Sequence, residues 1–63
     1  MSPPTTPAAY KAAREARGTQ AEVAAALGIN RVTLVKRETG AHGYPISIEA
    51  AVAMLALPEK SAG

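Results

Sequence analysis

The sequence predicts an all-α domain of four or five short helices. Helix-starting residues at Thr6, Thr19, Asn30 and Ser47 are each followed about ten residues later by a Gly or Pro that stops a helix. Between these signals apolar residues recur at helical spacing, and Ala fills many other positions. The chain has 63 residues, and a domain of this size buries only roughly 60% of the surface its unfolded chain exposes. We therefore expect marginal stability.

Composition divides the chain into three parts. Residues 1–6 are rich in Pro and Thr without apolar periodicity, which predicts a disordered arm. Residues 7–58 hold the helical signals and form the expected domain, and residues 59–63 form an expected flexible tail. The chain has no Cys, no apolar run long enough to span a membrane, and no signal-peptide pattern at its start. These features predict a soluble, cytoplasmic protein.

The first helix is expected to begin after Thr6 and to end at Gly18. Tyr10 lies on its apolar face, where a role in the core is favoured over stacking on a base. Arg14, on another side, should face solvent or a phosphate.

Residues 19–28 carry the clearest local signals. Thr19 and Glu22 form a capping box, in which each side chain bonds the other residue's backbone amide, so a helix should start there. Gly28 fits the left-handed position that ends a helix. Asn30 then caps a second helix over residues 31–39, which Gly40 ends. The short connection predicts two helices that cross steeply.

The last helix is expected over residues 48–57, after Ser47 and before Pro58, and it is apolar on two opposite faces. Such a small chain has too little material to cover both faces. We take the second face as a candidate homodimer interface. The alternative is that its alanines are tolerated at the surface and its larger residues fill gaps. The first face holds Ile48, Ala51, Val52 and Leu55, and the second holds Ala50, Ala53, Met54 and Leu57.

Positive charge gathers around the two-helix unit. The formal net charge is only +2, but six of the seven basic residues lie between positions 11 and 37. A local basic patch attracts polyanions such as nucleic acid, although an ordinary solvated surface can look the same. These residues are Lys11, Arg14, Arg17, Arg31, Lys36 and Arg37.

Helical spacing places Leu34 inward on the 31–39 helix and Val32 and Lys36 opposite it. Arg31, Val35 and Thr33 flank that outward row. Arg and Lys donate to guanine, Thr can bond a base edge or a phosphate, and Val can touch a thymine methyl group. An exposed Val is hard to explain on a solvated face, so we favour DNA reading over a surface helix with stray aliphatics.

The two-helix unit is thus interpreted as a DNA-binding helix-turn-helix. We assign base reading to Arg31, Val32, Thr33 and Lys36. The amides at the start of the 19–28 helix, with Gln20 beside them, are placed for a phosphate. The expected DNA-backbone contacts are Thr19, Gln20, Asn30, Arg14, Arg17 and Arg37.

The stretch RGTQAEVAAALGINRVTLVKRETG resembles the Cro/C1-type helix-turn-helix family, which is also called lambda-repressor-like or XRE. The following PISIEAAVAMLALP resembles the helix that closes that domain. In the family, the residue matching Gln20 contacts phosphate, and those matching Arg31, Val32, Thr33 and Lys36 face DNA. The resemblance implies an all-α lambda-repressor-like fold. Its short length suggests a phage or mobile-element regulator, including the small repressors that accompany anti-CRISPR genes.

Arg37 departs from the family, which usually has an aromatic or apolar residue there. Either its stem packs while its guanidinium reaches out, or the helix is set differently.

We expect a homodimeric repressor that reads an inverted repeat in double-stranded DNA, with reading helices about 34 Å apart. A protein-interaction module or antitoxin with the same fold is the alternative. His42 is a lone histidine, and no catalytic pair or phosphate loop is present. We therefore expect no enzyme activity, metal, cofactor, membrane partner or small-molecule effector.

Overall fold

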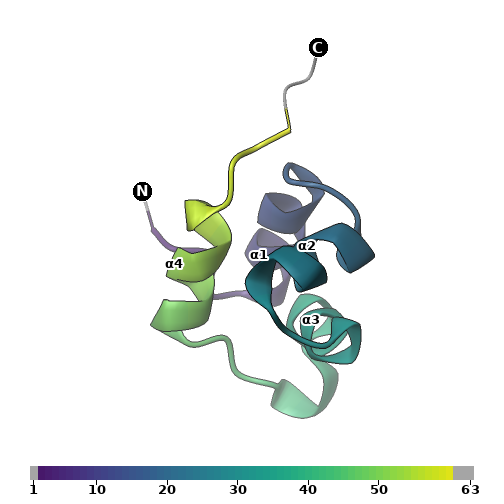
Figure 1. Cartoon of the computed structure of the whole chain (residues 1–63). Helices are drawn as coiled ribbons and strands as arrows, with labels where there is room; N and C mark the ends of the chain where they lie inside the picture. Colours follow the sequence, from purple (N-terminus) through teal and green to yellow (C-terminus); the bar gives the residue numbers. More distant parts are fainter. Residues whose placement is uncertain (1, 61–63) are drawn as a thin grey trace.

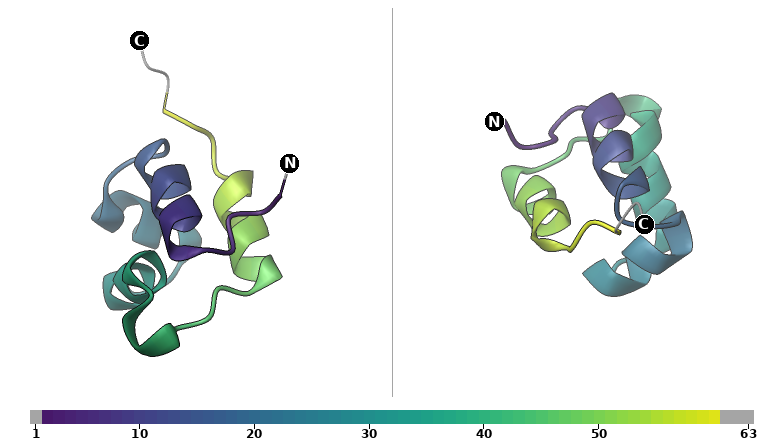
Figure 2. Two further views of the ribbon diagram at one scale, coloured as in Figure 1. Left: turned by 180° about the vertical axis from the view of Figure 1, so that it is seen from behind. Right: turned by 90° about the horizontal axis from the view of Figure 1, so that it is seen from above.

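The computed structural model describes residues 2–60, and Figure 1 shows an all-helical arrangement of this part of the chain. The all-α prediction is confirmed. Helix α1 contacts each of the other three α-helices, and α2 also contacts α3 (Figures 1 and 2). The elements are α1 (Pro7–Glu15), α2 (Gln20–Leu27), α3 (Arg31–Thr39), the 3₁₀ turn η1 (Ala41–Gly43) and α4 (Ile48–Ala56).

The predicted N-caps are confirmed at all four α-helices. The side-chain oxygens of Thr6, Thr19, Asn30 and Ser47 each accept a hydrogen bond from a first-turn amide. These bonds satisfy amides that have no partner inside their own helix. Two helix ends differ from the prediction. Helix α1 stops at Glu15, because the amides of Arg17 and Gly18 both turn back to the carbonyl of Arg14, and α4 stops one residue before Leu57.

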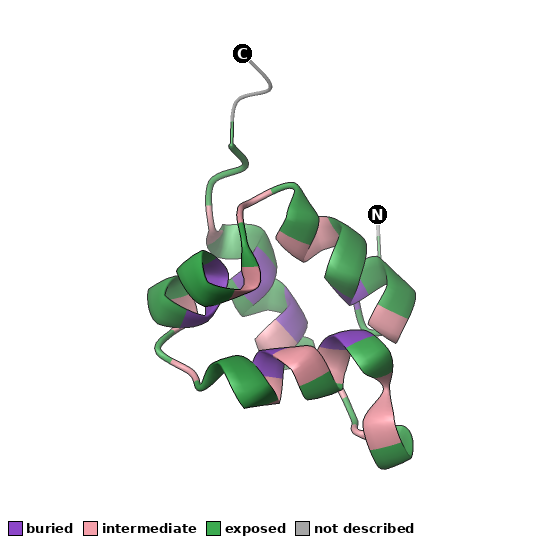
Figure 3. Cartoon of the chain, turned by 90° about the vertical axis from the view of Figure 1, so that its right-hand side faces the viewer, coloured by how far each residue is buried: buried purple, intermediate pink, exposed green. Residues whose placement is uncertain are grey.

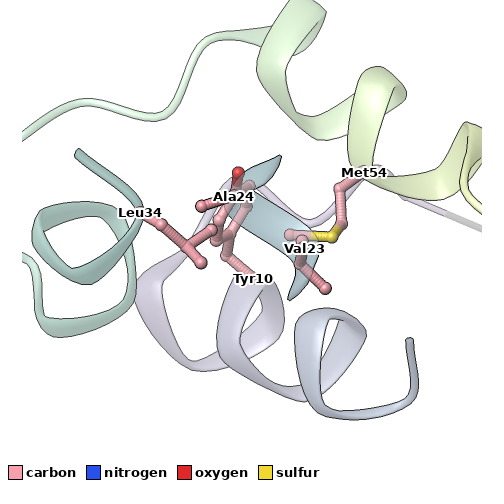
Figure 4. Packing of buried hydrophobic residues seen from close by; sticks show 5 residues of the cluster. All are labelled: Tyr10, Val23, Ala24, Leu34 and Met54. Atoms are coloured by element: carbon pink, nitrogen blue, oxygen red, sulfur yellow. The ribbon is translucent and has the colours of Figure 1, made fainter. Parts of the chain in front are cut away.

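The apolar core lies where the four helices meet. Tyr10, Leu34 and Met54 are 0% exposed. Figure 4 shows Met54 pointing from α4 toward Val23, with Ala24 and Leu34 around Tyr10. The expected core position of Tyr10 and the inward position of Leu34 are confirmed. Partly buried side chains pack against this cluster; they are Ala13, Leu27, Ile29, Ile46 and Leu57. Figure 3 colours the ribbon by burial, with buried, intermediate and exposed positions on the helices.

Helix α4 buries the larger residues of the face predicted as a dimer interface, together with Ala51 of the other face, which is 0% exposed. Met54 is 0% exposed, and Leu57 packs on the core, so neither forms an exposed dimer surface. Ala50 is half-buried, and only Ala53 of the predicted set is exposed. The reason is that two nearly equal apolar faces leave the rotation of a helix undetermined, and the long flexible side chain of Met54 fills the core better. The large apolar side chains exposed on α4 are instead Ile48 (61%), Val52 (52%) and Leu55 (40%).

Both terminal segments are more packed than predicted within residues 2–60. Pro4 is buried, in the segment that runs past α4 toward α1 (Figure 2). At the other end, the amide of Lys60 donates to the Ala16 carbonyl at 2.9 Å. The Lys60 ammonium donates to Oε1 of Glu22 at 2.8 Å. Residue 1 of the predicted arm (residues 1–6) and residues 61–63 of the predicted tail (residues 59–63) lie outside the described residues.

A buried ion pair connects α1 with α3. Nε and Nη2 of Arg14 donate to the two carboxylate oxygens of Glu38 at 2.9 and 3.1 Å. The Arg14 side chain is 11% exposed and that of Glu38 is 2% exposed. Nη1 of Arg14 also donates to the Gly18 carbonyl at 3.1 Å. The hydrogen bond from Arg14 to Glu38 raises the pKa of Arg14 above its usual value, although burial opposes the rise.

We expect Glu38→Ala to lower the free energy of unfolding by about 3 kcal/mol, because it leaves the Arg14 guanidinium buried without its counter-charge. Thermal unfolding followed by circular dichroism measures the loss. The double variant Arg14→Met/Glu38→Leu removes both charges and should recover most of the stability. A loss below about 1 kcal/mol in Glu38→Ala would contradict the structural role of the pair.

The Glu22 carboxyl group makes the stability of the fold depend on pH in the acid range. Its pKa is lowered from 4.5 to about 2, first by the hydrogen bond from Lys60 and then by its bonds with Thr19. The lowered pKa means that the folded state favours the carboxylate, so this stabilisation is full above the unfolded pKa of 4.5 and is lost as the pH falls toward about 2.

We expect the difference in unfolding free energy between the wild type and Glu22→Gln to shrink progressively as the pH falls from 4.5 toward about 2. Chemical unfolding across this range, with an NMR titration of the Glu22 carboxyl group, measures both quantities. Lys60→Ala should move the Glu22 pKa back toward its usual value. An equal stability difference at neutral pH and at the acid end would refute the linkage.

Candidate nucleic-acid interface

A tight turn sets the angle between α2 and α3. Gly28 adopts the left-handed conformation with φ of 69°, and the Ile29 amide donates to the Ala24 carbonyl at 3.0 Å. This pair of features ends α2 and sends the chain directly into the cap of α3. Ala24 is only 3% exposed. A larger side chain there would separate the two helices.

Helix α3 has a buried side and an exposed side. Leu34 anchors it in the core. Arg31, Val32 and Lys36 are exposed, and Val32 keeps 58% of its surface accessible. Thr33 is half-buried. The structure therefore places three of the four predicted base-reading residues fully on the exposed side of α3, with the fourth at its margin.

The predicted phosphate contacts around α2 are partly occupied within the chain. The Thr19 hydroxyl accepts from the Glu22 amide, and the Thr19 amide donates to the Glu22 carboxylate. Gln20 is half-buried, with Nε2 at 3.5 Å from Oε1 of Glu38. Asn30 is exposed, and its Oδ1 caps α3 by accepting from the Val32 amide at 2.8 Å. Thr19 and Asn30 are N-caps whose side chains accept from backbone amides, and Gln20 is the first residue of α2.

The prediction that Arg14 and Arg17 contact the DNA backbone conflicts with their geometry. Arg14 is turned inward to Glu38, as described above. Nε of Arg17 donates to the Leu57 carbonyl at 3.0 Å, and Nη1 donates to the Ala13 carbonyl at 2.8 Å. The Arg17 side chain is 7% exposed. These guanidiniums satisfy internal acceptors, so their positive charge is directed at the protein itself.

Arg37 also turns inward. Its Nη1 donates to the Tyr10 hydroxyl at 3.0 Å, and its guanidinium carbon lies 5.7 Å from the centre of the Tyr10 ring. Its stem therefore packs, as one of the two alternatives stated, but the guanidinium bonds to Tyr10 and does not reach out. This contact conflicts with the predicted backbone role of Arg37.

The exposed positive surface is consequently narrower than the sequence indicates. Arg31 and Lys36 make no salt bridge to any residue within the range 2–60. Both lie on α3, the predicted reading helix. Within the described range, Lys11 on α1 is also exposed without a salt bridge, and Lys60 pairs with Glu22.

Tyr44 is a neighbour of this surface that sequence reasoning missed. The Lys36 ammonium nitrogen lies 6.0 Å from the centre of the Tyr44 ring. Residues 41–45 show no helical spacing of apolar residues, and only the reversal of the chain after Gly40 brings Tyr44 back to α3. No sequence periodicity connects the two residues.

The remaining site classes gain no support from the described residues. His42 is exposed, with φ of 54°. Within residues 2–60 there is no group of three His, Cys, Asp or Glu residues placed to hold a metal. In the same range, no helix is long and apolar enough to cross a bilayer.

Comparison with known proteins agrees with this geometry. The helix-turn-helix family model HTH_3 matches residues 11–62, which is most of the chain. No curated protein and no solved structure gives a match. The matched region includes α2, α3 and α4, with the tight turn and the exposed side of α3. The chain therefore belongs to the Cro/C1-type helix-turn-helix family of DNA-binding regulators.

Proposed function

We propose that the protein is a dimeric transcriptional repressor that reads an inverted-repeat operator through α3. The observation that supports this best is the exposure of Val32 on α3 between Arg31 and Lys36, two cations that form no salt bridge within residues 2–60. A major groove admits an α-helix and presents acceptors at guanine and a methyl group at thymine.

The side chains on this face suit separate tasks. Arg31, at the first position of α3, can donate two hydrogen bonds to one guanine. Val32 offers an apolar contact for a thymine methyl group. Lys36, one turn further along, can donate to a second base. Gln20 and the start of α2 would meet the phosphate backbone, which fixes the register of the protein on DNA.

A second copy of the chain would double the reading surface. The corrected candidate for the interface is the exposed stripe on α4 formed by Ile48, Val52 and Leu55, which share one side of the helix at i, i+4 and i+7. A two-fold axis through such a stripe would pair it with itself, and in the proposed dimer the α3 helix of each copy would enter one of two successive major grooves. Binding at a promoter then represses by excluding polymerase.

The central test compares Arg31→Ala and Arg31→Lys after selection of binding sites from random duplex DNA. Both should lose preference at one position of each half-site by roughly 5- to 150-fold, because Lys lacks the two-pronged geometry of Arg. Both variants should keep a salt slope close to that of the wild type, because the slope counts contacts to phosphates and not to bases.

Two outcomes would contradict this assignment. If Arg31→Lys kept the full base preference, Arg31 would act as a charge near phosphate and not as a reader. If the wild type showed no salt-sensitive DNA affinity, a protein-interaction function would replace DNA reading.

Val52→Glu should raise the dimer dissociation constant by about tenfold or more, because the two-fold axis brings two like charges together. Sedimentation velocity over a concentration series measures it. Ala53→Glu is the matched control, since it adds the same charge to an exposed position about 100° around the same helix. Dissociation by Ala53→Glu with unchanged association of Val52→Glu would favour the face first predicted from sequence.

A further inference from the structure

The chain contains two aromatic residues, Tyr10 and Tyr44, and each lies against a cation at the end of α3. Tyr10 contacts Arg37, and Tyr44 contacts Lys36. These two cations are adjacent in sequence, so about 100° of helix rotation separates them. Both aromatic rings of the protein thus contact one pair of neighbouring cations, Lys36 and Arg37.

The two cation–ring contacts differ in burial. The Tyr10 ring is 0% exposed, and its hydroxyl accepts a hydrogen bond from Arg37. That contact draws Arg37 inward. Tyr44 is only half-buried, and Lys36 is exposed. The ring of Tyr44 therefore faces a cation that stays on the outer surface of α3, where the proposed DNA contacts are.

The backbone after α3 holds Tyr44 in this place. Gly40, His42 and Gly43 have φ values of 66°, 54° and 68°, which lie in the left-handed region. The amide of Gly43 donates to the Gly40 carbonyl and that of Tyr44 to the Ala41 carbonyl, both at 3.0 Å. The chain therefore reverses within a few residues, and the ring is set beside the last turn of α3 by hydrogen bonds that do not involve its side chain.

We propose that Tyr44 is a positioning residue for DNA reading, because its ring holds the Lys36 ammonium at the groove-facing surface. This role rests on the proposed function of α3. An ammonium on a flexible four-carbon stem loses rotamer freedom when it binds a base or a phosphate. A ring that already restricts the stem reduces that loss, and the attraction between a cation and an aromatic face supplies the restraint.

The test uses Tyr44→Leu and Tyr44→Phe on the DNA site that the wild type selects. Tyr44→Leu should lower the preference at the base position that Lys36→Ala identifies by about two- to fivefold, the size of an exposed cation–π contact. Tyr44→Phe should behave like the wild type, because it keeps the ring. If Tyr44→Phe loses as much as Tyr44→Leu, the hydroxyl is what matters, and the proposal is overturned.

Double variants separate positioning from general damage. The effects of Tyr44→Leu and Lys36→Ala should not add, because Tyr44 acts through Lys36. Arg31 lies at the other end of α3 and serves as the matched control, so Tyr44→Leu and Arg31→Ala should add. Additive effects with Lys36→Ala would show that Tyr44 acts by another route.

An NMR measurement on the free protein distinguishes failure of the Tyr44 proposal from failure of the proposed DNA-reading function. The ring current of Tyr44 should shift the ε-methylene protons of Lys36 in the NMR spectrum, and Tyr44→Leu should abolish the shift while Tyr44→Phe retains it. An absent shift in the wild type overturns the positioning role whatever the DNA data show. A wild type that selects no sequence overturns the proposed function and, with it, the DNA role of Lys36. Selective wild-type binding with Tyr44→Leu unchanged overturns the role of Tyr44 alone.

Discussion

The ion pair between Arg14 and Glu38 is the constraint on which the position of α3 depends. The core is made of a few mostly aliphatic side chains, and such contacts tolerate small rotations of one helix on another. A guanidinium that binds a carboxylate through two parallel hydrogen bonds tolerates much smaller rotations of the helices. Both donor–acceptor distances and the alignment of the two planar groups must be kept. Arg14 also bonds the Gly18 carbonyl just before α2. One buried side chain thus ties together the three helices whose mutual angle sets the exposed side of α3.

The basic residues fall into two main groups with different roles. Arg14, Arg17 and Arg37 end in acceptors supplied by the protein, where planar guanidiniums with several donors can satisfy more than one partner. Arg31 and Lys36 on α3, with Lys11 on α1, keep their charges at the surface, and Lys60 pairs with Glu22. In a small domain without a large apolar core, the hydrogen bonds of the three arginines in the first group help to fix how the helices pack. The second group is what an approaching polyanion would meet, so total charge overstates the electrostatic surface that recognition could use.

Local chemistry explains which features could be predicted from sequence. The capping box of Thr19 and Glu22 and the left-handed turn at Gly28 involve residues within one helical turn, and each was expected where it occurs. The partner of Arg14 lies 24 residues away along the chain, and no pattern of spacing points to it. The rotation of α4 was missed for a related reason, since two apolar faces of similar strength leave only tertiary packing to choose between them. The outward side of α3 was easier to predict from sequence, because Leu34 is the single strong apolar anchor of that helix.

The placement of the two tyrosines gives the molecule a pair of built-in optical reporters. The chain has no Trp, so its near-ultraviolet emission comes from Tyr10 and Tyr44 alone. Tyr10 is enclosed in the core with its hydroxyl bonded to Arg37, and its emission follows the packing of the helices. Tyr44 stands half-exposed beside Lys36 at the edge of α3. Folding and events at the outer surface are therefore registered by different chromophores, without any label attached to the protein.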